Sequence, residues 1–133
     1  MVDAVSASEG ERKWATALHA AALIGFVVPL GNVLAPLILW QLGRRRSLFV
    51  DVQGREAVNF HLSLLLYAVI GFVLILLPVG IVILLTVGAM LLVLPIVAAV
   101  QGGLGREFHY PAAIRFLPWM PPQVAPKDGG RAA

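Results

Sequence analysis

Two long stretches of this chain carry no formally charged side chain. One covers the 30 residues 14–43, and the other covers the 49 residues 57–105, between Glu56 and Arg106. A charged side chain at the centre of a bilayer costs about 3 kcal/mol or more. A soluble domain needs polar surface and rarely leaves so much of its length uncharged. The pattern therefore predicts an all-α integral membrane protein.

The second charge-free stretch divides into two spans. Crossing about 30 Å of hydrocarbon takes about 20 helical residues, and residues 57–77 and 81–101 each supply that length. Between them, Pro78-Val79-Gly80 predicts a tight turn, because proline does not readily continue a helix and glycine permits a reversal. We therefore expect an antiparallel transmembrane hairpin over residues 57–101.

The first stretch, residues 14–43, is too long for one untilted span and is interrupted near its centre. Asn32 is a candidate N-cap for a new helix, and Pro36 would lie close to the first turn of that helix, where proline costs least. We expect two half-helices, about 14–28 and 33–43, which makes three hydrophobic helical segments in all. The residues expected to break the first segment are Pro29, Gly31, Asn32 and Pro36.

Two arrangements of this broken segment satisfy the charge pattern. If it crosses once, the Arg44–Glu56 loop and the C-terminal end lie inside with eight basic residues; if it is re-entrant, all ten lie inside. Both obey the positive-inside tendency. The single crossing is slightly favoured, and both alternatives stay open. Either one places the Arg44–Glu56 loop and the C-terminus in the cytoplasm.

Short segments flank the hydrophobic part of a single membrane domain, residues 14–118. Residues 1–13 mix acidic with basic side chains, unlike a signal peptide, and are interpreted as an N-terminal tail. Residues 105–118 combine aromatic and basic side chains, which is typical of a segment lying on the membrane surface. Residues 119–133 are rich in proline and glycine and are predicted to be disordered.

A polar stripe runs along the expected helix that starts near Glu56. In lipid, an amide or hydroxyl turned towards acyl chains lacks a hydrogen-bond partner, so such a stripe should face protein. Packing between helices is the simpler interpretation, and a polar cavity or a partner groove is the functional one. The polar residues at i+3 and i+4 spacing are Glu56, Asn59, Ser63 and Tyr67, and Gly71 continues the line.

A second group of side chains could contact a partner or lipid headgroups. The arginine triplet after the first segment is interpreted first as an orientation anchor. His19 and His61 each lie about one turn inside an apolar stretch, where a histidine is more often a neutral hydrogen-bonding group than a ligand. They could be neighbours only in the re-entrant arrangement. The candidate contact residues are Arg44, Arg45, Arg46, Arg55, His61, Tyr110 and Arg115.

Composition narrows the functional classes. The absence of cysteine removes disulfides, thiolate catalysis and Cys-ligated metals, and three histidines without a carboxylate cluster do not indicate a metal site. The net charge of +3 lies beside apolar spans, where anionic lipid explains it better than nucleic acid. No nucleotide-binding glycine motif or catalytic set is present. An enzyme would depend on Glu56 or His61 alone, so we expect no enzyme and no cofactor.

Short motifs in three regions resemble the Tic20-like family of small bacterial membrane proteins, catalogued mainly as a domain of unknown function (DUF4870). The similarity covers about residues 16–117. Gln53 departs from it, because the family is expected to carry a histidine there. The resemblance implies a polytopic helical protein of the bacterial inner membrane and says little about activity. The matching residues are 29–32, 35–40, 49–51, 54–63, 105–108 and 110–111.

These features predict a small non-enzymatic membrane protein, an accessory or scaffold subunit that contacts a larger membrane partner. Its contact surface would be the 44–56 loop and the C-terminal segment. The alternative is a homo-oligomeric channel or translocation-type conduit lined by Asn59, Ser63 and Tyr67. Because three spans cannot enclose a pathway, this alternative requires self-association. No nucleic-acid partner is expected.

Overall fold

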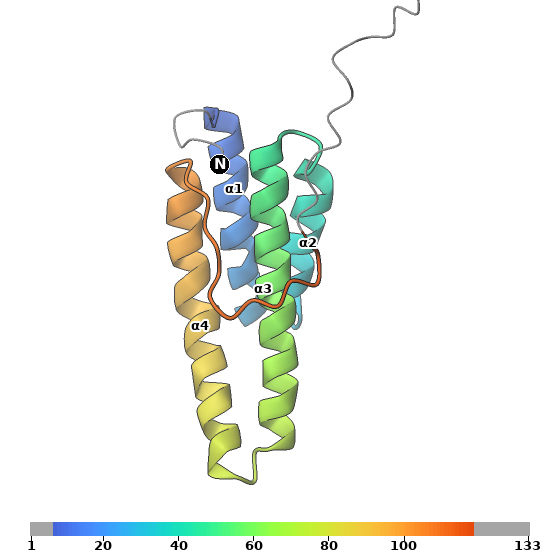
Figure 1. Ribbon diagram of the computed structural model, residues 1–133, viewed down its shortest axis with the longest axis vertical. Coiled ribbons are helices and arrows are strands. Elements are labelled where there is room, and N and C mark those ends of the chain that lie inside the picture. Colours follow the sequence, from blue (N-terminus) through green and yellow to red (C-terminus); the bar gives the residue numbers. More distant parts are fainter. Residues whose placement is uncertain (1–6, 119–133) are drawn as a thin grey trace, which may run out of the picture.

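The computed structural model describes residues 7–118 as a bundle of helices (Figure 1). No strand occurs among these residues, so the predicted all-α class is confirmed. The predicted disorder of residues 119–133 and the first six residues of the predicted tail fall outside the described part. In chain order the elements are α1 (Glu9–Ala20), the 3-10 helix η1 (Ala21–Phe26), α2 (Gly31–Gly43), α3 (Leu48–Val73) and α4 (Pro78–Gly103).

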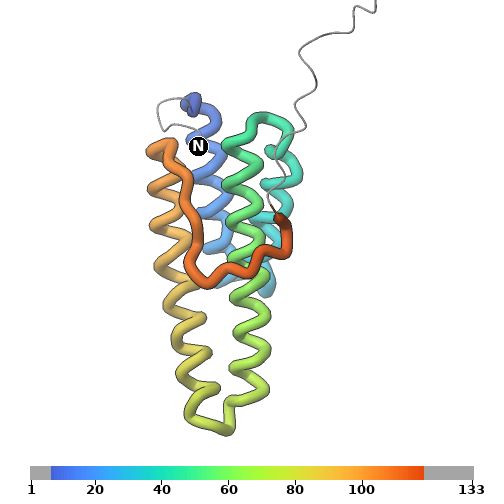
Figure 2. The backbone as a smooth tube through the Cα atoms, in the orientation of Figure 1, coloured from blue at the N-terminus to red at the C-terminus, as the bar shows by residue number. Residues whose placement is uncertain are grey.

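The broken first segment doubles back on itself. α1 and η1 descend along the upper part of the bundle, and α2 returns, so the start of α1 and the end of α2 lie at the same end of the molecule (Figure 1, Figure 2). η1 packs against α2, and α1 packs against α3 and α4. The two arms of the first segment therefore lie antiparallel, which is the fold expected of the re-entrant alternative and not of the slightly favoured single crossing.

The turn between η1 and α2 depends on one glycine and one unusual backbone conformation. A Cβ on Gly25 would come within 2.6 Å of the Asn32 nitrogen, so glycine allows the two arms to approach. Leu30, with φ 60°, takes the left-handed conformation and precedes α2 without a side-chain cap. The break thus lies where it was predicted, but Asn32 is inside the first turn of α2 and is not its N-cap.

α3 begins nine residues earlier than the predicted span. Ser47 is its N-cap, with the side-chain oxygen accepting from the backbone N–H of Val50 at 3.2 Å. Asp51 lies in the first turn, where the helix dipole favours an anion. The predicted Arg44–Glu56 loop is therefore wrong beyond residue 47, and Glu56 belongs to the third turn of α3.

α3 and α4 form the long hairpin, and each has 26 residues. Both are long and apolar enough to cross a membrane. Proline at the first position of α4 suits a helix start, because its missing N–H would have no helical partner there. The predicted turn residues 78–80 therefore belong to α4, and the chain reverses just before them.

The buried core lies in the upper half of the bundle. One cluster, which includes Phe60, Val87 and Tyr110, joins α3, α4 and the C-terminal segment. A second, which includes Leu18, Trp40 and Val50, joins α1, α2 and α3. Below the level where η1 ends and α2 begins, only α3 and α4 continue (Figure 2). Gly71 lies at their contact, facing Ile83 and Leu84.

The C-terminal segment, residues 104–118, is named the strap here. It is not helical beyond α4. It leaves the upper end of α4, runs down along the bundle and then crosses the face of α3 (Figure 1). The sequence predicted that residues 105–118 lie on the membrane surface, whereas in the structure they pack against the protein's own helices.

Candidate functional site

The polar stripe of α3 holds the strap through the strap's backbone. The Asn59 side chain donates to the Leu117 carbonyl at 3.0 Å and accepts from the Leu117 N–H at 2.7 Å. The Ser63 hydroxyl accepts from the Ile114 N–H at 2.6 Å, and the Tyr67 hydroxyl donates to the Ala112 carbonyl at 2.8 Å. The stripe therefore faces protein, and the protein that it faces is the end of the same chain.

Glu56 forms the charged end of this stripe. Its side chain is only 3% exposed, and its Oε1 accepts from Arg115 at 2.6 Å and from Nδ1 of His109 at 2.8 Å. Burying a carboxylate is costly unless it is paired and hydrogen-bonded. Arg115 of the strap thus pairs with the buried carboxylate of α3, and His109 adds a hydrogen bond to it, so that the strap is held at a second place.

A buried hydrogen-bond chain connects α1, α3 and the strap. The Tyr110 hydroxyl contacts Nδ1 of His19 at 2.9 Å, and Nε2 of His19 contacts Oε1 of Gln53 at 2.7 Å. The Gln53 amide nitrogen donates to the Arg106 carbonyl at 3.2 Å, which orients its oxygen towards His19. His19 must then donate from Nε2 and accept at Nδ1, so the arrangement suits a neutral imidazole.

The surroundings favour these protonation states. Burial lowers the pKa of His19 to about 4, although its hydrogen bond to Gln53 acts in the opposite direction. Burial and the charge of Glu56 raise the pKa of Tyr110, so its hydroxyl keeps the proton that it donates. The hydrogen-bond chain therefore acts as a fixed connection between elements at neutral pH.

His61 and Tyr110 were predicted to contact a partner or lipid, and the structure buries both. His61 is 0% exposed and donates from Nδ1 to the Ala57 carbonyl one turn earlier at 2.7 Å. Tyr110 stacks on Phe60 with ring centroids 4.0 Å apart. Their place inside the core leaves no free surface for a contact outside the chain.

Arg55 also makes its contacts within the protein. It bonds to Asp51 at 3.0 Å and to the Pro118 carbonyl at 3.0 Å, and its guanidinium lies 5.4 Å from the centroid of the Trp40 ring. The Trp40 indole N–H in turn donates to Asp51 at 2.8 Å. Arg55 thus joins the start of α3 to α2 and to the strap.

The arginine triplet remains exposed at the upper end of the bundle. Arg46 lies over the Trp14 ring at 4.3 Å from its centroid, and Arg44 lies over Trp40 at 5.7 Å. Such cation–π contacts hold guanidinium groups in place while their hydrogen-bond donors stay available. Trp40 itself is buried, so we call Arg44, Arg45, Arg46 and the partly exposed Trp14 the basic rim.

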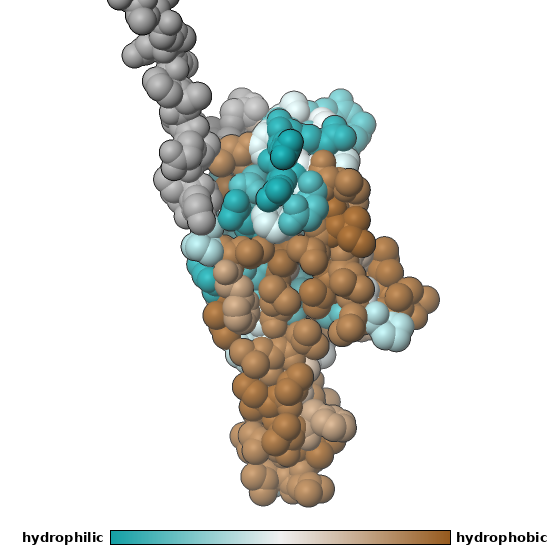
Figure 3. Space-filling view, turned by 90° about the vertical axis from the view of Figure 1, so that its right-hand side faces the viewer, coloured by the Kyte–Doolittle hydropathy of each residue, from teal (hydrophilic) through white to brown (hydrophobic). Residues whose placement is uncertain are grey.

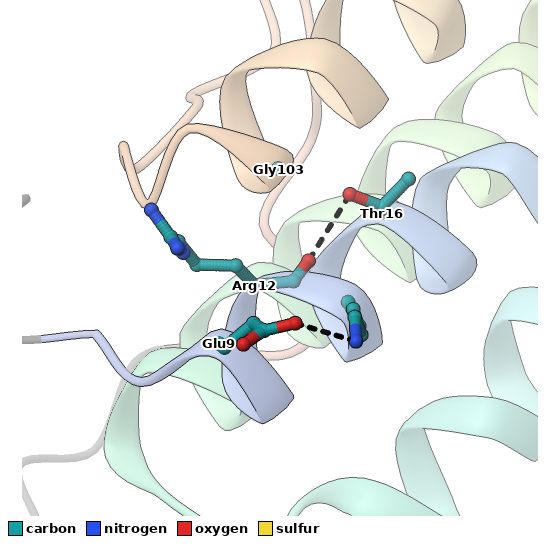
Figure 4. Close-up of a pocket in the computed structure, with 5 residues that line it drawn as sticks. Glu9, Arg12, Thr16 and Gly103 are labelled. Carbon is teal, nitrogen blue, oxygen red and sulfur yellow. Dashed lines mark hydrogen bonds and ion pairs between the residues drawn. The ribbon is translucent and has the colours of Figure 1, made fainter.

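A shallow cavity of about 310 Å³ lies beside the N-terminal turns of α1 (Figure 4). Arg12 reaches from α1 towards the end of α4, and Glu9 pairs with Lys13 at 2.6 Å. The Thr16 hydroxyl bonds to the Arg12 carbonyl at 3.0 Å. Within the described part of the chain, no group of three or more acidic or histidine side chains could hold a metal ion.

Gln53 is the site residue that the sequence interpretation missed. It was noted only as a departure from a family pattern, yet it is fully buried and connects three parts of the chain. Its spacing could have identified it, because Gln53 lies one turn before Glu56 and continues the polar stripe. This spacing has meaning only if the helix already includes residue 53, whereas the predicted span began at residue 57.

Acidification is expected to weaken the fold through His19, which lies in α1, outside the two long helices. Its pKa falls from 6.5 to about 4 on folding, so its contribution to stability is complete above pH 6.5 and is lost as the pH falls towards 4. Denaturation of the detergent-solubilised protein across this range should show the loss. In His19→Gln that part of the pH dependence should disappear. Parallel pH curves for the two proteins would contradict the assignment.

Together these features define a small helical protein, in which a hairpin of two long apolar helices, each long enough to cross a membrane, carries a shorter hairpin and a strap at one end. The chain belongs to the magnetosome magnetite crystal formation protein family (MamF/MmsF), which it matches over residues 10–117. No curated protein and no solved structure matches the chain.

This family assignment corrects the predicted Tic20-like membership, which is wrong. The match covers nearly the same residues, 10–117 against about 16–117, and places them in the MamF/MmsF family. The motifs that suggested the Tic20-like family mark the helix break, the start of α3 and the strap. Such short features report architecture, and architecture alone does not identify a family or a function.

Proposed function

We propose that this protein is a non-enzymatic accessory or scaffold subunit of the magnetosome membrane. In this role it supports magnetite crystal formation by contacting a larger membrane protein. The family description supports the magnetosome and the process of crystal formation, and the two long apolar helices support the membrane. One observation carries the proposal. The polar side chains of the α3 stripe form hydrogen bonds within the chain, whereas the arginine triplet stays exposed and available to a partner.

The state of the candidate acid–base groups supports a role without catalysis. Glu56 is paired with Arg115 and His109, and His61 is buried against its own helix. A general acid or base must reach a substrate proton within about 3 Å or through one water molecule. Neither side chain presents such a group at an accessible cavity in the described structure.

The basic rim has the composition of a protein contact surface. Arginine and tryptophan are enriched among the side chains that dominate binding energy at interfaces. Positive charge at this end also favours the cytoplasmic side of the membrane. We therefore place the rim in the cytoplasm, with an acidic surface of the partner as its complement.

The conduit alternative is less well supported. The side chains that would line it, Asn59, Ser63 and Tyr67, bond to the strap backbone, which covers that face of α3. Opening a pathway there would require the strap to leave α3 and its hydrogen bonds to these side chains to be broken.

The test is purification at endogenous level from native membranes. We expect a stoichiometric companion protein with the natural chain and its loss when Arg44, Arg45 and Arg46 are all replaced by glutamine. The variant should still be recovered from the membrane fraction. The matched control is the double change Glu9→Gln and Lys13→Gln, which removes an exposed charge pair at the same end. Recovery without any companion, or with the companion in both variants, would overturn the proposal.

A further inference from the structure

The turn between α3 and α4 is apolar on every side. Residues 74–79 are Leu, Ile, Leu, Leu, Pro and Val, and Leu76 is 94% exposed. The last residues of α3 are similar, with Phe72 and Val73 both largely exposed. Figure 3 shows the narrow lower end as hydrophobic over the whole visible face, with the hydrophilic residues gathered towards the opposite end. A turn that enters water would normally carry polar side chains.

Most backbone N–H groups of this turn form hydrogen bonds within the turn or to the end of α3. Four N–H groups, those of Leu74, Ile75, Leu77 and Gly80, bond to carbonyls within the preceding residues. Pro78 has no N–H to satisfy. In hydrocarbon, backbone groups must find partners inside the protein. Most N–H groups of this turn thus have a partner inside the protein, which lowers the cost of surrounding the turn with acyl chains.

Gly80 allows the turn to be this tight. A Cβ at position 80 would overlap the Leu74 carbonyl, so only glycine lets the start of α4 approach the end of α3 so closely. The close approach leaves no room for a water-filled loop. The tip therefore ends the hairpin with very little irregular backbone.

Helix length places this tip near the far side of a bilayer. α4 has 26 residues, about 39 Å at 1.5 Å per residue, compared with a hydrocarbon thickness of about 30 Å. A hairpin of this length fits by tilting. The Trp, Tyr, Lys and Arg residues that usually anchor a helix end at the interface are absent from residues 72–82.

We propose that the Leu74–Gly80 tip ends within the acyl chains of the far leaflet and presents nothing to the far aqueous phase. Its partner is lipid, and every charged group of the described chain lies in the opposite half of the bundle. This inference is independent of the proposed scaffold role. It implies that any recognition by this protein of a soluble or protein surface takes place on one side of the membrane.

The natural lack of cysteine makes the tip directly testable. Leu76→Cys and, as the matched control at the other end, Arg45→Cys are reconstituted as full chains in phosphatidylethanolamine/phosphatidylglycerol vesicles. A charged, membrane-impermeant maleimide is supplied on both sides by freeze–thaw. Because maleimide reacts with a thiolate in water, we expect at least tenfold slower labelling at position 76 than at 45, and equal labelling after detergent. Comparable rates before detergent would overturn the proposal.

A depth measurement separates lipid from other forms of protection. In the Leu76→Cys variant, an environment-sensitive dye attached to the new thiol before reconstitution should be quenched by lipids with a spin label near the end of the acyl chain. It should not respond to iodide in the water. Quenching by iodide, or no quenching by the lipid probe, would refute the embedded tip even if the maleimide result agreed with it. Val79→Cys repeats both measurements at a second position.

Discussion

Replacing Gly54 by valine is expected to destabilise the fold by about 2–4 kcal/mol. A Cβ at this position would overlap the indole of Trp40, which is 4% exposed and sits between α2 and α3. The helices must separate or the indole must leave its place, and either change breaks the Trp40–Asp51 hydrogen bond. The midpoint of denaturation in detergent, followed by far-UV circular dichroism, measures the loss.

Gly88→Val is the matched control for this prediction. Gly88 also lies inside a long helix, but a Cβ there meets nothing within 4 Å. Valine has a slightly higher helix propensity than glycine, so this change should be neutral or stabilising by a few tenths of a kcal/mol. If both variants unfolded alike, close contact at Gly54 would not be what holds α2 against α3.

The hairpin of long helices could be predicted because its signal is simple. A run of 49 uncharged residues with one Pro-Val-Gly interruption leaves few other arrangements in lipid. The start of α3 was missed because Asp51 and Arg55 looked like loop residues and Glu56 like the first turn of the helix. In the structure they lie on the first turns of α3, where their charges are paired with one another or with the strap. The Ser47 cap was the signal that could have placed the helix start.

The direction of the first segment was harder to predict. Its length and its central prolines indicate a break, but a break is compatible with both a crossing and a return. The chain reverses direction because Gly25 allows a close approach to Asn32 and because Leu30 adopts the left-handed conformation. A left-handed leucine has no recognisable sequence pattern, because the conformation is unfavourable for this residue and is held only by its surroundings.

The contacts of the polar stripe could also be predicted only in part from the sequence. Its helical spacing correctly indicates a face turned towards protein, but it does not reveal the partner. The strap is bound through backbone N–H and carbonyl groups, which nearly every residue has, at sequence separations of 45 to 58 residues. An extended segment held in this way leaves no periodic pattern of its own. For the same reason the role of Gln53 as the bridge between His19 and Arg106 became visible only in three dimensions.

Asn59→Leu is expected to release the strap from α3. Leucine is close to asparagine in size, so the change removes two hydrogen bonds to Leu117 without leaving a large cavity. The orphaned backbone groups should cost about 2 kcal/mol or more. Amide hydrogen exchange of the detergent-solubilised protein should rise about tenfold or more at Ile114 and Leu117, while the core of α4 stays protected.

Thr86→Val is the control, because the Thr86 hydroxyl bonds only to the Val82 carbonyl of its own helix in the described structure. It should leave exchange of the strap unchanged, and equal exchange in Asn59→Leu and Thr86→Val would refute the role of Asn59.

The Asn59→Leu variant also separates the two functional alternatives in sealed liposomes. A lined conduit would lose its flux when Asn59 becomes leucine, whereas a face sealed by the strap gives tight vesicles with the natural chain from the start.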